Sequence, residues 1–509
     1  MLSESPAIRP RQIAVEPRDR PSANYRALLI LFTIETLAIN IAQLPDSLRF
    51  DRFAFCDHGA NLTLQYLVAN GMRPALDFGY HYGLLPILVG RVWFAAFGAT
   101  PWAYQCAMVL ADLLCAWALA QMLSQLKVGI VGVGLAVLTL AYSFQATYGN
   151  FTHAIEAVLL SHALAQQLRG FRSRALALCA VALFAKPSMA YVYGLLLIIL
   201  IVRDLGYEKS LLRKLARGLA PAAIVFAAMA VSLAAIFGLP ALIHTAVPIE
   251  GVTNYHALNF GLFKAGREFW APKELPWIYY AIHAAGLWIA ATIFLFGSTL
   301  LLQRARALRW TAGTEAILTC AILHFVFLAC FFGNQWSWTY YSYLLMIGVS
   351  VATDLGPISR RLGLILCGIA VISYTDLAYF TYRGWHTTAP ARDTASLWAS
   401  ADERREWLEV RGLIHGRQAV MLDSIGAAEL LFAGFEPPVS LFLEPGLMQS
   451  GDVQRKVDQL SSAEFAIVPV TIAACSGVPD APQFKDALKS FDLAWEGKHF
   501  EVFRRRAAP

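Results

Sequence analysis

Two carboxylates, two histidines and two tyrosines gather in one polar stretch that follows the first hydrophobic segment. They are Asp57, His58, Asp77, Tyr80, His81 and Tyr82. A carboxylate beside a hydroxyl can take its proton as a general base, and partial burial raises its pKa toward the working pH. Charges close to hydrocarbon are costly and are kept where they do chemistry or line a pathway. We therefore expect the active site here, with Asp57 and Asp77 catalytic and the other four side chains binding substrate.

Each candidate also has a plainer interpretation. Asp57 and Asp77 would cap short helices in the loop, since aspartate is common at N-caps. Lys186, followed by Pro187 between two apolar runs, would hold a phosphate or anchor its helix by snorkelling to the headgroups. Arg73 in the same stretch and Arg267 in a later loop would converge on that anion, or form ordinary loop ion pairs.

Glu156 is a further candidate for substrate binding. It lies three residues after His153, so the two share one face of the helix predicted over 151–168. Glu156 would assist Asp57 in binding an acceptor, or form an interhelical hydrogen bond.

The sequence indicates no cofactor. It has no GxGxxG after a strand and no Walker motif. The eight cysteines have no CxxC spacing, so neither a zinc site nor a disulfide framework is indicated. The two aspartates still leave room for a divalent metal ion. An outward-facing site would lack nucleotide sugars, so a transferase there would need an activated donor carried in the membrane.

Membrane helices must position these residues. The chain has 509 residues, of which 57% are hydrophobic and 15% are charged, and apolar runs bounded by arginine clusters are typical of a polytopic membrane protein. The net charge of +6 comes from short basic clusters between these runs and does not indicate nucleic acid. The candidate spans are 27–44, 101–123, 128–147, 151–168, 175–185, 189–203, 219–239, 277–302, 315–333, 338–353 and 362–381.

Positive charge predicts the orientation of these spans. Four basic clusters should be cytoplasmic, at 169–174, 203–217, 304–309 and 360–361. From a cytoplasmic basic N-terminus over 1–26, every cluster is satisfied if the apolar stretch 83–98 lies along the outer leaflet. About eleven crossings then leave the C-terminus outside. The short run 175–185 is kept as half of a hairpin with Lys186 and Pro187 at its outer tip.

The tail after Thr381 is no longer apolar. It has strand-like runs at 419–422, 465–469 and 500–503, and helix-like runs at 427–432 and 483–491. This alternation predicts a small α/β domain over 382–509 on the outer, extracytoplasmic face, with 382–407 as its tether. The transmembrane domain would then span 27–381 and carry the outer loop 45–82.

Three motifs together resemble the first outer loop of GT-C membrane glycosyltransferases. They are Asp57-His58-Gly59, Ala69-Asn70-Gly71, and Asp77-Phe78-Gly79-Tyr80-His81-Tyr82-Gly83-Leu84-Leu85-Pro86. The resemblance is strongest to the branch with protein O-mannosyltransferases and the lipid A aminoarabinose transferase. That branch carries an acidic residue, a glycine, and an aromatic stretch leading into an apolar helix that ends in Phe-Gly, as at Phe97-Gly98. The expected proline after Gly83 is Leu84 here, with proline at 86 instead.

The resemblance implies an inverting transferase that takes a sugar from a polyprenyl-phosphate donor. Asp57 would be the general base. Lys186, which matches a lysine that the family often has between two spans, would bind the departing lipid phosphate. Asp77 would orient the loop or the acceptor, or be the base itself, and the branch generally needs no metal. The site would lie on the periplasmic face of a bacterial inner membrane, with a glycan, lipid or protein acceptor.

A transporter or flippase of lipid-linked saccharide is the competing hypothesis. Such proteins carry polar residues inside their spans and often contain inverted repeats. Here the polar residues gather at the outer edge, and the sequence has no visible internal repeat. A third hypothesis is an inactive scaffold whose outer domain binds a partner, and the loop of carboxylates argues against it.

Overall fold

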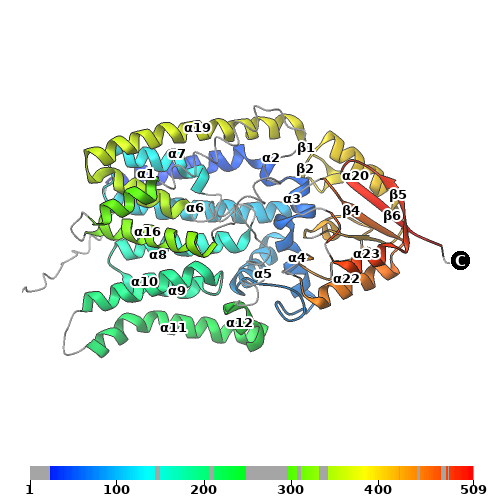
Figure 1. The fold of residues 1–509 in the computed structure, drawn as a ribbon, viewed down its shortest axis with the longest axis horizontal. Helices are drawn as coiled ribbons and strands as arrows, with labels where there is room; N and C mark the ends of the chain where they lie inside the picture. Colours follow the sequence, from blue (N-terminus) through cyan, green and yellow to red (C-terminus); the bar gives the residue numbers. More distant parts are fainter. Residues whose placement is uncertain are drawn as a thin grey trace, which may run out of the picture.

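The computed structural model gives an elongated molecule with a helical bundle at one end and a small β-sheet at the other (Figure 1). It describes residues 23–143, 150–205, 211–247, 296–306, 311–331, 342–423, 425–443, 448–471, 477–479 and 481–507. Arg267, the basic segment 1–22 and most of the span predicted at 277–302 lie outside these residues.

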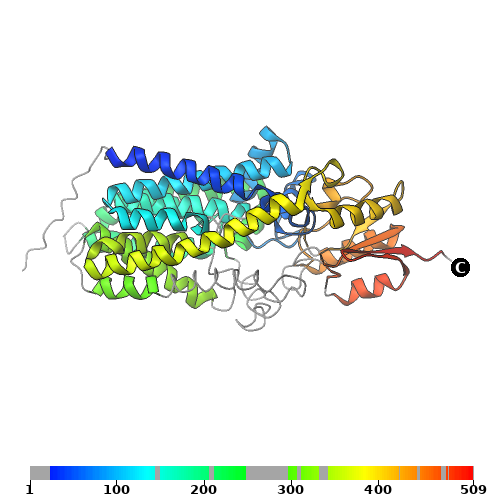
Figure 2. The same cartoon turned by 90° about the horizontal axis from the view of Figure 1, so that it is seen from above.

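Each of the remaining predicted spans contains a helix. The bundle helices are α1 (Ala23–Ala42), α6 (Pro101–Gln125), α7 (Ile130–Ser143), α8 (Phe151–Leu168), α9 (Arg172–Ala182), α10 (Pro187–Leu205), α11 (Leu211–Phe237), α16 (Ala312–Phe331), α18 (Ser342–Ala352) and α19 (Pro357–Thr387). Figure 2 shows α1 and α19 along one side of the bundle. A short turn, η2 (Thr353–Leu355), links α18 to α19.

Small side chains let the central helices approach one another closely. The buried core where α6, α8 and α9 meet is rich in alanine, including Ala116, Ala120, Ala163 and Ala175. Close backbone approach through small residues is the usual way in which membrane helices pack. The many alanines therefore explain why these helices pack closely against one another and not around a core of large apolar side chains.

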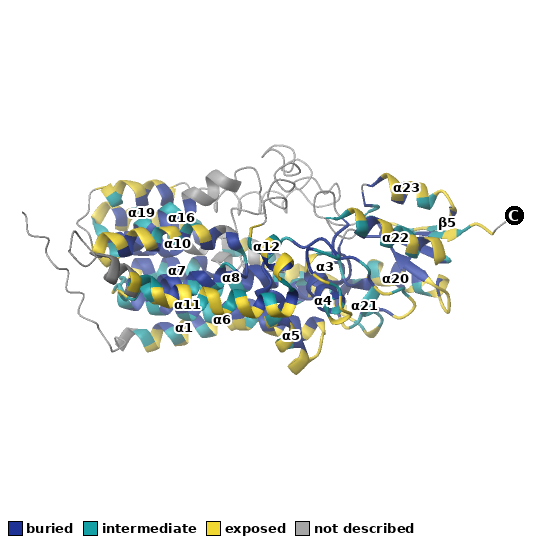
Figure 3. Ribbon diagram, turned by 90° about the horizontal axis from the view of Figure 1, so that it is seen from below, coloured by how far each residue is buried: buried dark blue, intermediate teal, exposed yellow. Residues whose placement is uncertain are grey.

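The outward faces of the bundle are apolar, as expected for helices that contact lipid. Ile30 and Ile34 on α1, Ile224 and Val231 on α11, and Leu364 on α19 are all exposed. Figure 3 shows much of the outer surface of these helices as exposed. Within the described residues, three helices are long and apolar enough to cross a membrane, at Tyr25–Ala42, Pro101–Gln125 and Gly218–Phe237. The bundle is thus that of a polytopic membrane protein, and its exact number of crossings stays a prediction.

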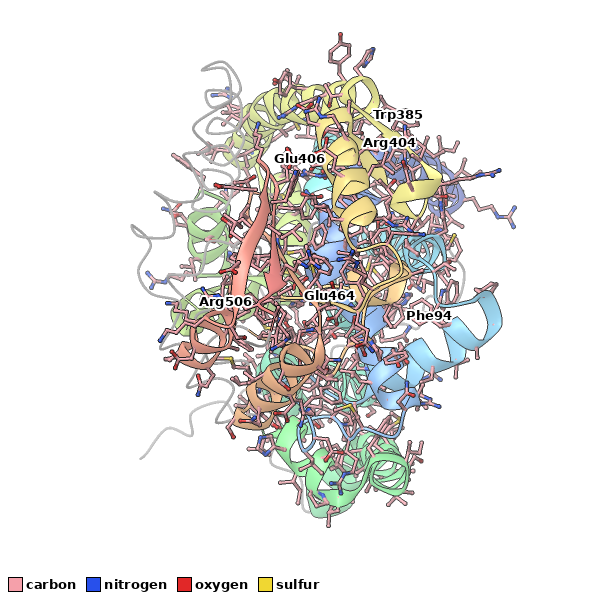
Figure 4. All side chains as sticks on the ribbon, turned by 90° about the vertical axis from the view of Figure 1, so that its right-hand side faces the viewer. Phe94, Trp385, Arg404, Glu406, Glu464 and Arg506 are labelled. Atoms are coloured by element: carbon pink, nitrogen blue, oxygen red, sulfur yellow. The ribbon has the colours of Figure 1, made fainter. Side chains whose placement is uncertain are left out.

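Short helices occupy much of the predicted outer loop, namely α2 (Leu44–Ser47), α3 (Phe50–Phe55) and α4 (Asp57–Ala69). Two further short helices are α5 (Leu85–Phe97), in the apolar stretch 83–98, and α12 (Leu239–Ala246), after α11. In Figure 1, α3 and α4 lie between the bundle and the sheet. Figure 4 looks along the long axis and shows α5, which carries Phe94, extending outward across the end of the bundle. The predicted position of this helix along the outer leaflet stays a prediction.

The C-terminal segment forms a four-stranded sheet with the order β3-β4-β6-β5. Its strands are β3 (Ala419–Met421), β4 (Phe465–Pro469), β5 (Phe491–Glu496) and β6 (Phe500–Arg505). β3 pairs parallel with β4, and the other pairs are antiparallel. Its helices are α20 (Ala401–Leu413), α21 (Ala428–Leu431), α22 (Ser450–Ser462) and α23 (Pro482–Leu488). The three predicted strand-like runs coincide with β3, β4 and β6, whereas the domain boundary at 382 and its outer location stay predictions.

The prediction of a tether over 382–407 is wrong. α19 continues to Thr387, and the chain then forms a β1 (Thr388–Pro390) and β2 (Trp398–Ser400) hairpin around η3 (Arg392–Thr394). The indole of Trp385 donates to the Ala42 carbonyl at 3.0 Å, and the Trp398 amide donates to the Leu48 carbonyl at 2.8 Å. These hydrogen bonds therefore hold the segment against the end of α1 and the outer loop.

One aromatic cluster joins the loop to the sheet. Trp407 of α20 is completely buried and its ring packs against Phe50 of α3, Phe432 and Phe500 of β6. Phe55, at the end of α3, packs against the same tryptophan and Phe500. Burial of such large side chains stabilises the contact by roughly 2 kcal/mol each. The segment that leads into Asp57 is therefore held from both sides.

Candidate functional site

Asp57 is the first residue of α4, directly after the buried turn from α3. The N-cap position belongs to Cys56, so Asp57 does not cap the helix. Its side chain keeps contact with solvent, while the surrounding protein removes enough water to raise its pKa above the ordinary value. No hydrogen bond or ion pair of this carboxylate occurs within the described part of the chain. A solvated carboxylate with a raised pKa has the properties of a general base.

Gly59 explains the third position of the Asp57-His58-Gly59 motif. A Cβ added at Gly59 would lie 1.8 Å from the Phe53 carbonyl oxygen and 2.7 Å from the Ala427 nitrogen. The Ala427 amide in turn donates to the carbonyls of Phe53 and Ala54, both at 3.1 Å. α3, α4 and the C-terminal segment therefore meet at a point where only glycine fits, and this junction fixes the start of α4.

Lys186 lies in the turn between α9 and α10 and contacts the first turn of α8. Its ammonium donates to Nδ1 of His153 at 3.0 Å, and the same nitrogen lies 4.0 Å from a carboxylate oxygen of Glu156. His153 and Glu156 are 5% and 1% exposed, so the cluster is largely withdrawn from water. Burial lowers the pKa of Lys186, and attraction to the Glu156 carboxylate opposes this shift in part.

The loop over residues 73–83 carries Tyr80 and Tyr82 and is called the aromatic loop below. It reaches Lys186 through a short backbone pairing. The Gly83 amide donates to the Ala185 carbonyl at 2.9 Å, and the Leu85 amide to the Phe184 carbonyl at 2.8 Å. A Cβ on Gly83 would lie only 2.0 Å from the Phe184 oxygen. The glycine of the Tyr82-Gly83 pair is therefore required by close backbone approach.

Tyr80 and Tyr82 form an aromatic wall beside Lys186. The Tyr80 hydroxyl donates to the Gly83 carbonyl at 2.9 Å and also bonds the Thr152 side chain. The Tyr82 ring packs edge-on against Tyr80 at 5.9 Å and against His153 at 6.0 Å between ring centroids. Both tyrosines therefore reach the first turn of α8.

The first turn of α8 joins Asp57 to this cluster. Asp57 interacts electrostatically with the hydroxyl of Tyr104 on α6, and the Tyr104 ring packs against Phe151 at 6.2 Å. Asn150 caps the helix by accepting from the Thr152 amide at 2.9 Å. The positive end of a helix dipole favours an anion. The turn therefore combines a helix N-terminus and a lysine with a nearby candidate base.

Asp77 and Arg73 lie apart from this cluster and pair with each other. Arg73 donates to both carboxylate oxygens of Asp77, at 2.9 and 3.0 Å, and its amide donates at 2.7 Å. These hydrogen bonds hold the pKa of Asp77 below its ordinary value. Asp77 is thus a weaker base than Asp57, and its geometry is that of a residue that shapes the loop.

His58 is buried between α3 and α6. Its ring packs against Phe53 at 5.5 Å and lies 6.4 Å from the Tyr104 ring. Burial, together with the nearby Arg52, lowers the pKa of His58 to about 3, so the ring is neutral at neutral pH. His81 is half-buried in the aromatic loop. Within the described residues, no three His, Cys, Asp or Glu side chains are grouped so as to hold a metal ion.

No sequence pattern pointed to the contacts that the beginning of α22 makes with the loop around Asp77. Asp452 Oδ2 accepts from the Gly79 amide at 3.0 Å, and Gln449 Nε2 donates to the Ala75 carbonyl at 3.1 Å. Arg455 donates to the carbonyl of Asp77. His153, by contrast, is visible in the sequence because it shares a helix face with Glu156.

Comparison with known proteins identifies the fold. No protein-family model matches the chain, and no curated protein sequence matches it. A solved structure does: the crystal structure of ArnT from Cupriavidus metallidurans bound to undecaprenyl phosphate. The match has a TM-score of 0.52 and covers 95% of this chain and 98% of that one. This chain has the ArnT fold.

ArnT is a lipid A aminoarabinose transferase of the GT-C class. The resemblance drawn from the loop motifs is therefore confirmed at the level of the fold. The two chains are 14% identical, and at this distance a shared fold does not carry over a substrate or a catalytic residue. Activity has to be argued from the side chains of this ArnT-like site.

Proposed function

We propose that this protein is a membrane glycosyltransferase that moves a sugar from a polyprenyl-phosphate donor to an acceptor hydroxyl at the periplasmic face. One observation carries the proposal. Lys186 contacts the first turn of α8 through His153, and Asp57 reaches the same turn through Tyr104 and Phe151. An anion site with a base connected to the same helix end is what transfer from a phosphate-linked sugar requires. The ArnT structure, with undecaprenyl phosphate bound, supports this class of donor.

Asp57 acts as the general base in this proposal. It takes the proton of the acceptor hydroxyl as the oxygen attacks the anomeric carbon of the donor. The bond between that carbon and the phosphate oxygen breaks, and the bonding electron pair leaves with the lipid phosphate. Because attack comes from the face opposite the leaving group, the sugar is inverted. A base of this kind contributes roughly 10²- to 10⁴-fold to the rate.

Lys186 stabilises the departing phosphate. Its ammonium and the positive end of α8 oppose the negative charge that grows on the leaving oxygen. His153 and Glu156 hold the ammonium in place. Tyr80 and Tyr82 flank this position and offer rings and hydroxyl groups to a sugar.

Asp77 and Arg73 position the loop in this proposal. Their bidentate pair leaves Asp57 as the base. Arg267 stays a candidate for the phosphate on sequence grounds alone. The mechanism routes no step through a metal, and the acceptor is a glycan, lipid or protein of the cell envelope.

The test is transfer by purified wild type and Asp57→Asn in liposomes. Radiolabelled polyprenyl-phosphate sugars are supplied with a total envelope extract, and both the products and the location of the lipid are followed. Label in a new product with wild type only supports the proposal and identifies the acceptor fraction. Labelled lipid that crosses the bilayer without being consumed would replace the proposal with the flippase hypothesis.

A further inference from the structure

The beginning of α22 forms hydrogen bonds with the backbone of the aromatic loop at three alternate residues. Gln449 donates to the carbonyl of Ala75, Arg455 to the carbonyl of Asp77, and Asp452 accepts from the amide of Gly79. Every one of these contacts joins the C-terminal segment to the loop across more than 370 residues of sequence. In Figure 1, α22 lies next to α23 at the sheet end of the molecule.

Asp452 joins the other two residues to the loop through its carboxylate. Its side chain is completely buried, where an ionised carboxylate is tolerated only if donors surround it. Oδ2 accepts from the Gln449 amide at 2.7 Å and from the Gly79 amide at 3.0 Å. Oδ1 accepts from Arg455 at 2.6 Å. The loop amide is therefore one of the donors that offset the energetic cost of burying this carboxylate.

Asp77 is held at both ends as a result. Its carboxylate pairs with Arg73, while its carbonyl accepts from Arg455. The loop between Arg73 and Gly79 thus has its shape fixed by one ion pair of its own and by α22.

A chain of contacts leads from Gly79 to the residue before Lys186. Tyr80 follows Gly79 and is 1% exposed, and its hydroxyl donates to the carbonyl of Gly83 at 2.9 Å. The Gly83 amide donates to the carbonyl of Ala185, the residue before Lys186. A displacement of Gly79 would therefore be transmitted to both the aromatic wall and the lysine.

We propose that Asp452 and Arg455 are positioning residues for sugar transfer, and that α22 holds the aromatic loop against Lys186. The inference rests on the proposed function. Neither side chain contacts the candidate base or the lysine in the described structure, so both act through the backbone of the loop. A displacement of about 1 Å at a reacting centre can cost on the order of 100-fold in rate.

The experiment compares full-length wild type with Asp452→Ala, Arg455→Ala and the double variant. Asp458→Ala is the matched control, because Asp458 is exposed on the same helix and, among the described residues, its carboxylate accepts a hydrogen bond only from Gln454. Amide hydrogen exchange across residues 75–83 needs no substrate. The kcat and KM for transfer, and the melting temperature, are measured on the same preparations.

We expect faster exchange in the loop and a kcat lower by about 10- to 100-fold in Asp452→Ala. The double variant should be little worse than either single one, because the two residues act as a unit. Asp452→Asn, which keeps an oxygen for the Gly79 amide, should restore part of the rate. Asp458→Ala should match wild type in all three measurements.

Three results would overturn the inference in different ways. If wild type transfers sugar and Asp452→Ala keeps its kcat, KM and loop exchange, the positioning role is wrong and the proposed function stands. If wild type transfers no sugar with any donor, the proposed function fails and takes the catalytic role of α22 with it. A loss of rate that follows the melting temperature, with unchanged loop exchange, would also overturn it.

Discussion

Asp57 and Asp77 show how two similar residues in one motif come to differ. Asp57 begins a helix, and its desolvated surroundings raise its pKa. Asp77 is paired with an arginine four residues away, which lowers its pKa. The spacing of Arg73 and Asp77 was visible in the sequence, whereas the desolvation of Asp57 depends on how α3, α4 and α6 pack. The two candidates for the base that the sequence left open therefore lie in different electrostatic surroundings.

Replacement of Lys186 by glutamine should weaken donor binding more than it affects folding. The ammonium contributes a charge-assisted contact to phosphate worth roughly 1.5–3 kcal/mol, so the affinity for undecaprenyl phosphate should fall by about 10- to 100-fold. Binding of undecaprenyl phosphate to the purified protein measures this. Lys127→Gln, in the turn after α6, is the control, and equal affinity of Lys186→Gln and wild type would exclude the phosphate contact.

Asp423, after β3, predicts a pH dependence of stability. Burial, with the nearby Glu429, raises its pKa from the ordinary 3.8 to about 8. Between about pH 4 and 8 the unfolded chain has lost this proton while the folded protein keeps it. The free energy of unfolding therefore falls as pH rises through this window. The melting temperature of Asp423→Asn, which cannot ionise, should gain on wild type from pH 4 to pH 8, and a constant difference would contradict the assignment.

At the scale of elements, the turn between α9 and α10 positions Lys186, whatever the number of membrane crossings. α9 has 11 residues, a rise of about 16 Å, which is short for a bilayer core of about 30 Å. Its end is set by the backbone pairing of Gly83 with Ala185. α9 and α10 do form a hairpin with Lys186 in its turn, where the outer loop pairs with the bundle, whereas the outer location of this turn stays a prediction.

Gly83→Ala should break this pairing. Its Cβ would lie 2.0 Å from the Phe184 oxygen, so one backbone must move, and both transfer and melting temperature should fall. Gly134→Ala on α7 is the matched control, because a Cβ there meets nothing within 4 Å and alanine favours a helix by about 1 kcal/mol. Equal melting temperatures for Gly83→Ala and wild type would mean that the loop does not approach the turn this closely.

The helices and strands were largely predictable from the sequence, since apolar runs and alternation follow from burial. The wrong tether over 382–407 and the missed α22 contacts have a common cause. Trp398 bonds Leu48 and Asp452 bonds Gly79 across long stretches of chain. Such pairs depend on how the C-terminal sheet docks on the loop, and no local pattern encodes that docking.

At the scale of the whole molecule, the loop that carries Asp57 lies between an apolar bundle and a polar sheet (Figure 1). The basic clusters predict that the sheet end is outside the membrane. A C-terminal alkaline phosphatase fusion should therefore be active in a bacterial host, and a fluorescent-protein fusion that matures only in the cytoplasm should be dark. The opposite pair of results would invert the topology and put the site on the cytoplasmic face.

The most direct test of the account is the rate of sugar transfer by Asp57→Asn beside its affinity for undecaprenyl phosphate. The account predicts a kcat lower by about 10²- to 10⁴-fold, with unchanged lipid affinity and melting temperature, because asparagine keeps the shape of the side chain and loses its basicity. A variant that binds lipid, stays folded and transfers sugar at the rate of wild type would contradict the assignment of Asp57 as the base.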